Sequence, residues 1–158
     1  MKDCLFCKIA AKEIPCHKVW ESKTHLAFLT IFPNTPGFTV VIPKKHYSSY
    51  AFDLKESVLT KLVLAAKKVG KLIDKKLPGV GRTGLIFEGF GVDHVHAKLF
   101  PMHGTAKLKK RKPIISKQTK FFHAYEGYIS SHDCKRAPDY QLAKIASKIR
   151  GKTIKNAK

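Results

Sequence analysis

Residues 94–100 read HVHAKLF, and this short stretch decides both the fold and the chemistry expected of the chain. It places His94 and His96 two residues apart, with Lys98 where a regular alternation would put a third histidine. Three interpretations are open: a three-histidine site that has lost a member, a working site of variant design, or a plain β-strand with two imidazoles on its outer face. The surrounding sequence has to decide among them.

The alternation of polar and apolar residues in this stretch predicts a β-strand, in which successive side chains point to opposite faces. We expect the two histidines and the lysine to share one face. The alternating apolar residues Val95, Ala97 and Leu99 would then point into the core. Two imidazoles two residues apart on a strand are roughly 6–7 Å from each other, close enough to act on one bound group.

The composition indicates one folded domain with a strong positive charge. A chain of 158 residues with 44% apolar residues can bury a single core. Its 31 basic and 11 acidic residues give a net charge of +20. Residues 1–105 carry 16 basic and 8 acidic side chains, whereas residues 106–158 carry 15 and 3. Such an excess of positive charge favours binding to nucleotides, nucleic acid or an acidic membrane face. A basic surface that only faces solvent explains the charge equally well.

The N-terminus and the cysteines bear on location and metal binding. MKDCLFCKIAAKE lacks the apolar region of a secretory signal, and no run approaches the ~18–20 apolar residues of a membrane span. We therefore expect a cytoplasmic protein without membrane association, whose cysteines are thiols or metal ligands. Cys4 and Cys7 have zinc-ligand spacing, but two cysteines do not complete a tetrahedral site. Cys16 and Cys134 have no partner at motif spacing.

Local patterns predict an α+β fold with an antiparallel sheet. Apolar periodicity and turn signals predict helices at 4–13, 53–77 and from Asp139, and strands at 17–22, 24–31, 37–46, 82–89 and 94–100. Asp53 to Glu56 read as a capping box. The stripe expected to be buried on the long helix is Leu59, Leu62, Val63, Ala66, Val69 and Ile73. Beyond Pro101 we expect a basic exposed arm at 107–120 and a small strand at 125–130.

Four stretches carry a resemblance to a known family. They are CLFCKI with KEIP (4–15), HLAFLTI (25–31), GFTVVIPKKH (37–46) and DHVHAKLFP (93–101). In this order and spacing the chain resembles the histidine triad (HIT) superfamily of nucleotide hydrolases and transferases, specifically a small bacterial-type member with a variant triad. The matching stretches span about the first 105 residues, two thirds of the chain.

The resemblance implies a HIT domain at 1–105, with a five-stranded antiparallel sheet, one long helix and a short N-terminal helix, paired into a homodimer. The basic extension at 106–158, with a terminal helix, would pack on the same domain. Members bind a nucleoside phosphate, and the middle histidine of the triad attacks its α-phosphorus. By position this nucleophile is His96. A neutral imidazole is a competent nucleophile near pH 7, and a main-chain carbonyl can fix its second nitrogen.

The chain departs from the family pattern in three places. Lys98 replaces the third histidine; a Lys⁺ about 7 Å away contributes ~2 kcal/mol at an effective dielectric of ~20, which would lower the pKa of His96. Lys98 could also bind phosphate as a point charge. Thr30 stands where an acidic residue usually grips the ribose, and a hydroxyl makes one such bond instead of two. The short loop GFGVD leaves Gly89 and Gly91 to offer N–H groups to phosphate.

The resemblance also implies a base pocket and a metal site. Leu5, Phe6, Phe28 and Ile31 match positions that form the base pocket in relatives, and each is equally plausible as core. In a number of bacterial members two histidines complete a zinc site with the cysteine pair; here these are His46 and His94. A bound zinc would make His94 a ligand and leave His96 and Lys98 as the chemical pair. The alternatives are two buried thiols with His46 near the phosphate pocket, and, least favoured, a redox pair.

The function expected from these residues is that of a nucleotide hydrolase. It would act on nucleoside phosphate anhydrides or phosphoramidates through a covalent nucleotidyl-histidine. One alternative is a nucleotidyltransferase or phosphorylase, because branches of the superfamily with those activities carry glutamine at the third position. The other alternative is a nucleotide- or nucleic-acid-binding protein with weak catalysis, which would use the basic arm at 107–120.

Overall fold

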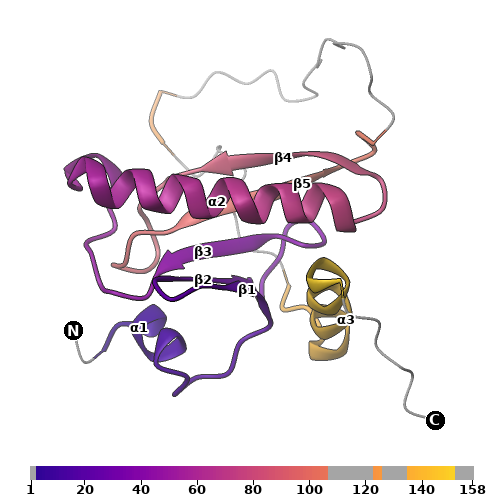
Figure 1. Cartoon of the computed structure of the whole chain (residues 1–158), viewed down its shortest axis with the longest axis horizontal. Helices are drawn as coiled ribbons and strands as arrows, with labels where there is room; N and C mark the ends of the chain where they lie inside the picture. The colour runs from indigo at the N-terminus through magenta and orange to yellow at the C-terminus, as the bar shows by residue number, and fades with distance from the viewer. Residues whose placement is uncertain (1–2, 107–122, 126–134, 152–158) are drawn as a thin grey trace.

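The computed structural model describes residues 3–106, 123–125 and 135–151, and these residues form a five-stranded antiparallel sheet flanked by helices (Figure 1). The strands are ordered β1-β2-β3-β5-β4. Their bounds are Lys18–Glu21 (β1), His25–Leu29 (β2), Thr39–Pro43 (β3), Val80–Ile86 (β4) and Ala97–His103 (β5). The helices are α1 (Leu5–Ala10), the 3₁₀ turn η1 (Ala51–Asp53), α2 (Glu56–Lys76) and α3 (Asp139–Arg150). The predicted α+β class and five-stranded antiparallel sheet are confirmed.

The sheet is covered on both faces, which explains the continuous apolar runs of its central strands. One face packs under α2 and α3, while α1 closes the opposite face (Figure 1). Every residue of β2 and β3 is buried. A strand buried on both faces has no polar side to alternate with, so it appears in the sequence as an unbroken apolar run. β3 lies between β2 and β5, so the strand that directly follows His94 and His96 pairs with the buried centre of the sheet.

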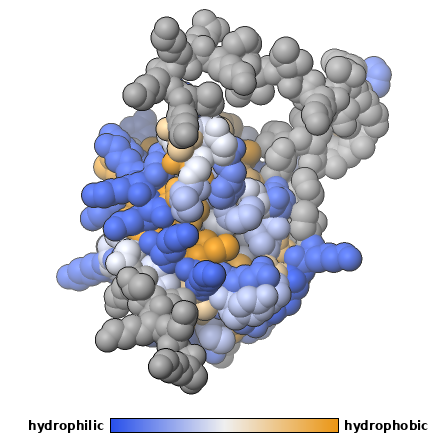
Figure 2. Space-filling model, turned by 90° about the vertical axis from the view of Figure 1, so that its right-hand side faces the viewer, coloured by the Kyte–Doolittle hydropathy of each residue, from blue (hydrophilic) through white to orange (hydrophobic). Residues whose placement is uncertain are grey.

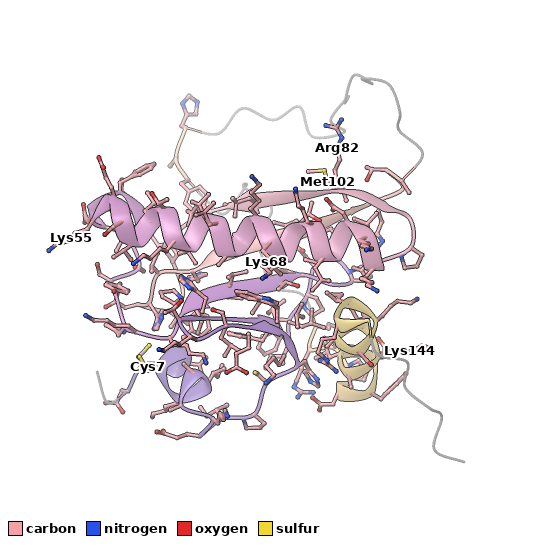
Figure 3. The ribbon with its side chains drawn as sticks, in the orientation of Figure 1. Cys7, Lys55, Lys68, Arg82, Met102 and Lys144 are labelled. Carbon is pink, nitrogen blue, oxygen red and sulfur yellow. The ribbon has the colours of Figure 1, made fainter. Side chains whose placement is uncertain are left out.

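Helix α2 buries a stripe of residues spaced three or four apart, as the periodicity predicted. Its buried residues are Leu62, Ala65, Ala66, Val69 and Ile73. The inclusion of Val63 was wrong: its side chain is 37% exposed, because it lies one position beyond the stripe. Lys68, in the middle of the helix (Figure 3), places its ammonium 5.4 Å from the ring centroid of Trp20, a cation–π distance.

The capping box predicted at the start of α2 does not form. Asp53 lies in η1, Leu54 is extended, and the N-cap of α2 is Lys55, which makes no side-chain cap hydrogen bond. The chain therefore leaves the helical path between Asp53 and Glu56. The carboxylate of Asp53 is thus placed one turn too early to accept from the first N–H groups of α2.

The turn before β3 requires a glycine. Gly37 has a φ of +88°, and a Cβ at this position would lie 2.6 Å from Cδ1 of Leu77 at the end of α2. Any side chain here would be strained by the positive φ, and its Cβ would displace the side chain of Leu77. The glycine that ends the PNTPG sequence at 33–37 is therefore explained by its positive φ and by the close approach of Leu77.

Helix α3 packs into the same core as α2. Leu142, Ala146 and Ile149 are almost completely buried there. The start of the helix is tied to the first strands, because Asp139 bonds to Nε2 of His17 at 2.9 Å. On the molecular face that carries α3, hydrophilic side chains predominate (Figure 2). The division of the chain at residue 105 stays a prediction, as does an exposed arm at 107–120, which lies outside the described residues together with 126–130 of the expected small strand.

The described part of the chain holds no helix that is both long and apolar enough to cross a membrane.

Replacing Ile149 by alanine tests whether α3 is part of the core. Removing a fully buried isoleucine side chain costs about 2–5 kcal/mol, from lost burial and the cavity left behind. We expect Ile149→Ala to lower the free energy of unfolding by that amount in chemical denaturation. Tyr140→Ala is the control, because Tyr140 lies on the same helix but is 70% exposed. Equal stability of the two variants would contradict the packing of α3.

Candidate functional site

The two histidines lie in the loop that leads into β5, which begins at Ala97. The prediction that they belong to the strand was wrong, because the N–H of Val95 donates to the carbonyl of Tyr47 instead of pairing with β3. The alternation of faces nevertheless holds: Val95 is in the core under α2. The rings of His94 and His96 lie on the side of α1. Their exposed fractions of 0% and 4% exclude an outer-face position.

A second chain segment fixes this loop in place. The N–H of Ser49 donates to Oδ1 of Asp93 at 2.9 Å, next to the Val95–Tyr47 bond. Gly89 has a φ of +80°, and a Cβ there would lie 3.4 Å from the carbonyl oxygen of Ser49. The loop and the segment after β3 therefore approach so closely that a side chain at position 89 would be strained.

His94 has one ring nitrogen committed to the main chain. Its Nε2 lies 2.9 Å from the carbonyl oxygen of Pro43, so Nε2 carries the proton and donates. Nδ1 is then an acceptor, and it lies 3.4 Å from Sγ of Cys4 and 3.5 Å from Sγ of Cys7. Burial lowers the pKa of His94, which favours the neutral ring. A neutral imidazole with one nitrogen hydrogen-bonded to a carbonyl is the usual form of a metal-ligating histidine.

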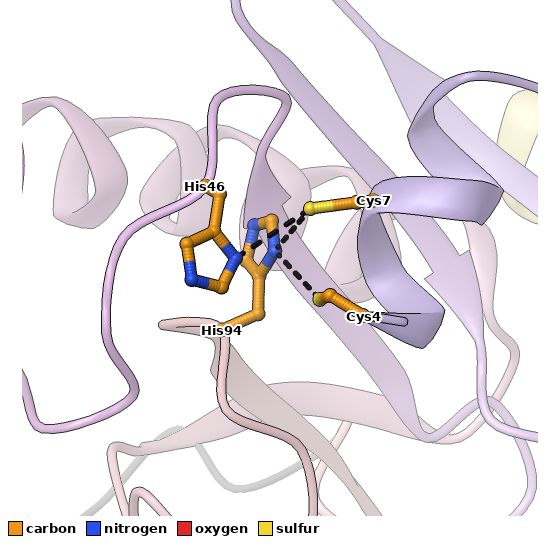
Figure 4. A group of neighbouring side chains, drawn as sticks. All are labelled: Cys4, Cys7, His46 and His94. Atoms are coloured by element: carbon orange, nitrogen blue, oxygen red, sulfur yellow. Dashed lines mark hydrogen bonds between the residues drawn. The ribbon is translucent and has the colours of Figure 1, made fainter. Parts of the chain in front are cut away.

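Four side chains meet at this point: Cys4, Cys7, His46 and His94 (Figure 4). Their ligand atoms all lie within 4.8 Å of one another, and Nδ1 of His46 is 3.5 Å from Sγ of Cys7. A tetrahedral zinc with bonds of ~2.3 Å to sulfur and ~2.1 Å to nitrogen separates such ligands by about 3.6 Å. The observed sulfur–nitrogen distances match that spacing, so this group could hold a metal ion.

His96 is oriented by the main chain of its neighbour. Its Nδ1 donates to the carbonyl of His94 at 2.8 Å, which leaves Nε2 as the nitrogen with a free lone pair. Burial lowers the pKa of His96, and the charge of Lys98 lowers it further. The His94 carbonyl and the Glu88 carboxylate act in the opposite direction. The environment as a whole favours a neutral ring with a defined tautomer.

A mostly apolar cavity of about 580 Å³ opens beside His96. Eight of the residues predicted for catalysis or substrate binding line it: Leu5, Phe6, Phe28, Thr30, Ile31, Gly91, His96 and Lys98. Gly89 and His94 do not line it; Gly89 packs on the segment after β3 and His94 lies in the cysteine–histidine group. Sequence reasoning missed other lining residues, including Glu88, Phe32, Phe38, Phe90 and Tyr125.

Glu88 is the most consequential of the missed residues, because it pairs with Lys98. Nζ of Lys98 lies 2.5 Å from Oε2 of Glu88, and the two side chains are only 13% and 8% exposed. The local sequence pattern gives no signal for this pair, whereas the register of two strands does. Lys98 pairs with Ile86 across the β4–β5 ladder, and continuing this antiparallel register sets Glu88 opposite His96. The carboxylate offsets the field that Lys98 exerts on His96.

The walls of the cavity come from distant parts of the chain. Oγ1 of Thr30 accepts from the N–H of Phe32 at 3.2 Å, so its own O–H is left to donate. The rings of Phe90 and Tyr125 stack with centroids 5.8 Å apart and an interplanar angle of 21°. Tyr125 lies beyond residue 105, so the predicted extension contributes to the wall of the cavity.

The fold and the histidine segment agree with a known family, since the sequence profile of the HIT domain matches residues 11–105. The chain belongs to the HIT domain family. This confirms the predicted family and the HIT-type fold, and the relatives described next confirm the prediction of a HIT-family enzyme.

Three relatives illustrate the similarity. The adenosine 5'-monophosphoramidase of Schizosaccharomyces pombe is 38% identical over 99 residues, which cover 62% of this chain and 73% of the relative. A HIT family hydrolase from Legionella pneumophila is 34% identical with a TM-score of 0.55, covering 62% and 91% of the two chains. A zinc-bound histidine triad protein from Mycobacterium smegmatis shares the fold with a TM-score of 0.69, at 19% identity and 95% and 92% coverage.

The Lys98–Glu88 pair predicts a measurable coupling energy in this HIT protein. Breaking a fully buried ion pair costs ~3–5 kcal/mol because one charge is left unpaired, and a pair that lines a cavity should lose less. A double-mutant cycle with Lys98→Met and Glu88→Gln, read from chemical denaturation, should give a coupling of ~1–3 kcal/mol. Additive effects of the two substitutions would contradict the pairing.

Proposed function

We propose that this HIT protein is a nucleotide hydrolase that acts on nucleoside phosphate anhydrides or phosphoramidates and releases a nucleoside monophosphate. The observation that carries the proposal is His96, a neutral, oriented imidazole whose second nitrogen is available beside an apolar cavity. The names of the similar proteins support the same reaction class, because one is an adenosine 5'-monophosphoramidase and another a hydrolase.

The proposed reaction proceeds in two displacements at the α-phosphorus. The Nε2 lone pair of His96 forms the N–P bond, and the bond to the leaving group breaks with its electron pair. The ring gains positive charge, which the His94 carbonyl stabilises through the Nδ1–H bond. Water then forms a P–O bond, the electron pair of the N–P bond returns to Nε2, and a proton passes to solvent.

Other residues that line the cavity would bind the base, the ribose and the phosphate. The apolar and aromatic side chains of Leu5, Phe6, Phe28 and Ile31 would contact the base. The O–H of Thr30 would donate one hydrogen bond to the ribose. Gly91 lines the same cavity as His96, and its N–H would bind the phosphate together with the ammonium of Lys98.

The cysteine–histidine group supports a structural zinc held by Cys4, Cys7, His46 and His94. The fit rests on the tetrahedral spacing of the donor atoms and on the Pro43 carbonyl, which fixes the tautomer of His94. A zinc ion there would tie α1 to the histidine segment and would supply no chemistry to the substrate. His94 then acts as a ligand, and the chemical pair is His96 with Lys98.

Metal analysis tests the zinc site. We expect about one zinc ion per chain in the purified protein, since four ligands complete a closed tetrahedral site. Cys4→Ser and Cys7→Ser should each lose the metal and lower the melting temperature. Cys16→Ser is the matched control and should retain the metal, because its thiol lies in the cavity wall outside the group. Full zinc content in both of the first two variants would refute the site.

Trapping the intermediate tests the nucleophile. The protein is incubated with adenosine phosphoramidate or diadenosine tetraphosphate, quenched rapidly and analysed by mass spectrometry. We expect release of AMP and an adduct of one AMP on the peptide that contains His96. His96→Ala should abolish both, because no other imidazole in the described residues lines the cavity.

The control for this experiment is His103→Ala. His103 lies at the end of β5 and donates to the carbonyl of Pro36, away from the cavity. This variant should keep both the turnover and the adduct. If neither substrate is turned over by the parent protein, or if His96→Ala retains the adduct, the proposed function fails.

A nucleotidyltransferase activity, a homodimer, a cytoplasmic location and nucleic-acid binding through the basic segment at 107–120 stay predictions.

A further inference from the structure

A second cleft lies on the α2 side of the sheet, away from His96. It has a volume of about 340 Å³ and lies where the start of β2, the end of β3 and the first half of α2 meet. The register of the two strands places His25 opposite Pro43, and the N–H of Lys44 donates to the carbonyl of Thr24 at 2.8 Å. No described residue lines both this cleft and the cavity beside His96.

The cleft is lined by four lysines, Lys23, Lys44, Lys45 and Lys61, and we call it the basic cleft. No acidic side chain is among the described residues that line it. Lys44 pairs with Glu21 at 2.6 Å, but Glu21 itself lies outside the cleft. The other three lysines form no ion pair within the described part of the chain. A cleft lined by one sign of charge concentrates oppositely charged ions more strongly than an open surface does.

His25 gives the basic cleft a buried polar group. Its side chain is 6% exposed and lies on the α2 face of β2, two residues before Ala27, which belongs to the core under α2. Its Nδ1 lies 2.9 Å from the hydroxyl oxygen of Thr24. Its Nε2 forms no hydrogen bond with any described residue. Because His25 lines the cleft, this nitrogen is available to a ligand that enters it.

The electrostatic surroundings of His25 set the role of this nitrogen. Burial lowers the pKa of His25, and the charge of Lys61 lowers it further, so the ring is neutral near pH 7. When the Thr24 hydroxyl donates to Nδ1, the single ring proton is on Nε2. The imidazole then offers an N–H donor to an acceptor in the cleft, among ammonium groups that are also donors.

We propose that the basic cleft, formed by the four lysines with Thr24 and His25, is a binding site for a compact oligophosphate anion such as inorganic pyrophosphate or tripolyphosphate. Lysine ammonium groups bind phosphate as point charges, and the buried imidazole adds one directional hydrogen bond. The site is separate from the cavity of the proposed function and does not depend on that function. It adds a second place at which this chain binds phosphate.

The shape of the cleft favours a compact anion over a nucleic-acid strand. Its volume of about 340 Å³ holds a few phosphate groups. A single strand is bound instead along an extended basic groove, with aromatic side chains on which successive bases stack. An oligophosphate concentrates several negative charges in a small space, so it can contact several of the lysines at once. Binding of nucleic acid is therefore the alternative that the experiment has to exclude.

Calorimetric titration of the full chain with inorganic tripolyphosphate tests the site, in about 0.15 M salt to screen weak surface binding. We expect saturable binding of one anion per chain. Lys23→Gln and Lys61→Gln should each weaken it about tenfold, because each removes one charge-assisted contact. Lys71→Gln is the matched control, an exposed lysine on α2 outside the cleft. It should change the affinity less than about twofold, because salt screens distant exposed charges.

Amide NMR spectra of the parent protein locate the anion without any variant. Added tripolyphosphate should shift the signals of Thr24, His25 and Lys44 and leave those of Gly91 and Lys98, in the other cavity, unchanged. His25→Phe keeps an aromatic ring under α2 and removes both ring nitrogens. It should keep the melting temperature within a few degrees and weaken binding several-fold. Unchanged affinity in this variant would contradict the site as described.

Three other results would overturn the proposal. One is the absence of saturable binding. The second is equal weakening by Lys71→Gln and Lys61→Gln, or NMR shifts confined to the cavity beside His96, because the anion would then bind to net charge or to the other site. The third is a single-stranded DNA oligonucleotide that binds more tightly than tripolyphosphate with the same dependence on Lys23 and Lys61. None of these measurements requires turnover, so the proposed function can fail while this site is confirmed, and the reverse.

Discussion

The arrangement of the site depends on one buried residue, His94, which makes three connections at once. Its Nε2 donates to the Pro43 carbonyl at the end of β3, and its Nδ1 faces Cys4 and Cys7 at the start of α1. Its own carbonyl accepts from Nδ1 of His96. The sheet, the N-terminal helix and the imidazole of His96 are therefore positioned relative to one another through the side chain and the peptide group of His94. This hydrogen-bond network favours a single arrangement of the three parts, because a buried polar group left without a hydrogen bond would be costly. Cys7 on α1 lies at the end of the molecule opposite to Lys144 on α3 (Figure 3), so α3 stabilises the core without contacting this group.

The second constraint is electrostatic. An unpaired lysine in an apolar cavity beside His96 would be costly, and Glu88 lowers that cost by pairing with Lys98 at 2.5 Å. The same carboxylate opposes the effect of Lys98 on His96, so burial is the main reason that the pKa of His96 is low. Lys98 and Glu88 therefore form a charge pair beside an oriented imidazole, and the interpretation of HVHAKLF as a working site of variant design stays a prediction.

Much of the fold could be predicted from the sequence because its signals are local. The apolar runs of β2 and β3 and the stripe on α2 follow from burial, and the residue types around Cys4 and His94 carried the family resemblance. The features that were missed depend on how distant segments meet. Asp53 was predicted to cap α2, but the extended backbone of Leu54 moves it away from the start of the helix. His94 was predicted to lie in a strand, but the N–H of Val95 donates to the carbonyl of Tyr47 instead of to a neighbouring strand. Glu88 becomes visible only when the register of β4 and β5 is continued past Ile86. Tyr125 reaches the cavity from beyond residue 105, which no local pattern indicates.

The central claim is that His96 attacks the α-phosphorus while the main chain of His94 holds its ring. A crystal structure of the protein with a bound, non-hydrolysable nucleotide tests it most directly. The account predicts Nε2 of His96 within about 3.5 Å of the α-phosphorus, in line with the bond to the leaving group, and Nδ1 still donating to the His94 carbonyl. An α-phosphate that lies against another side chain, with the ring of His96 turned away or bonded elsewhere through Nε2, would contradict the account.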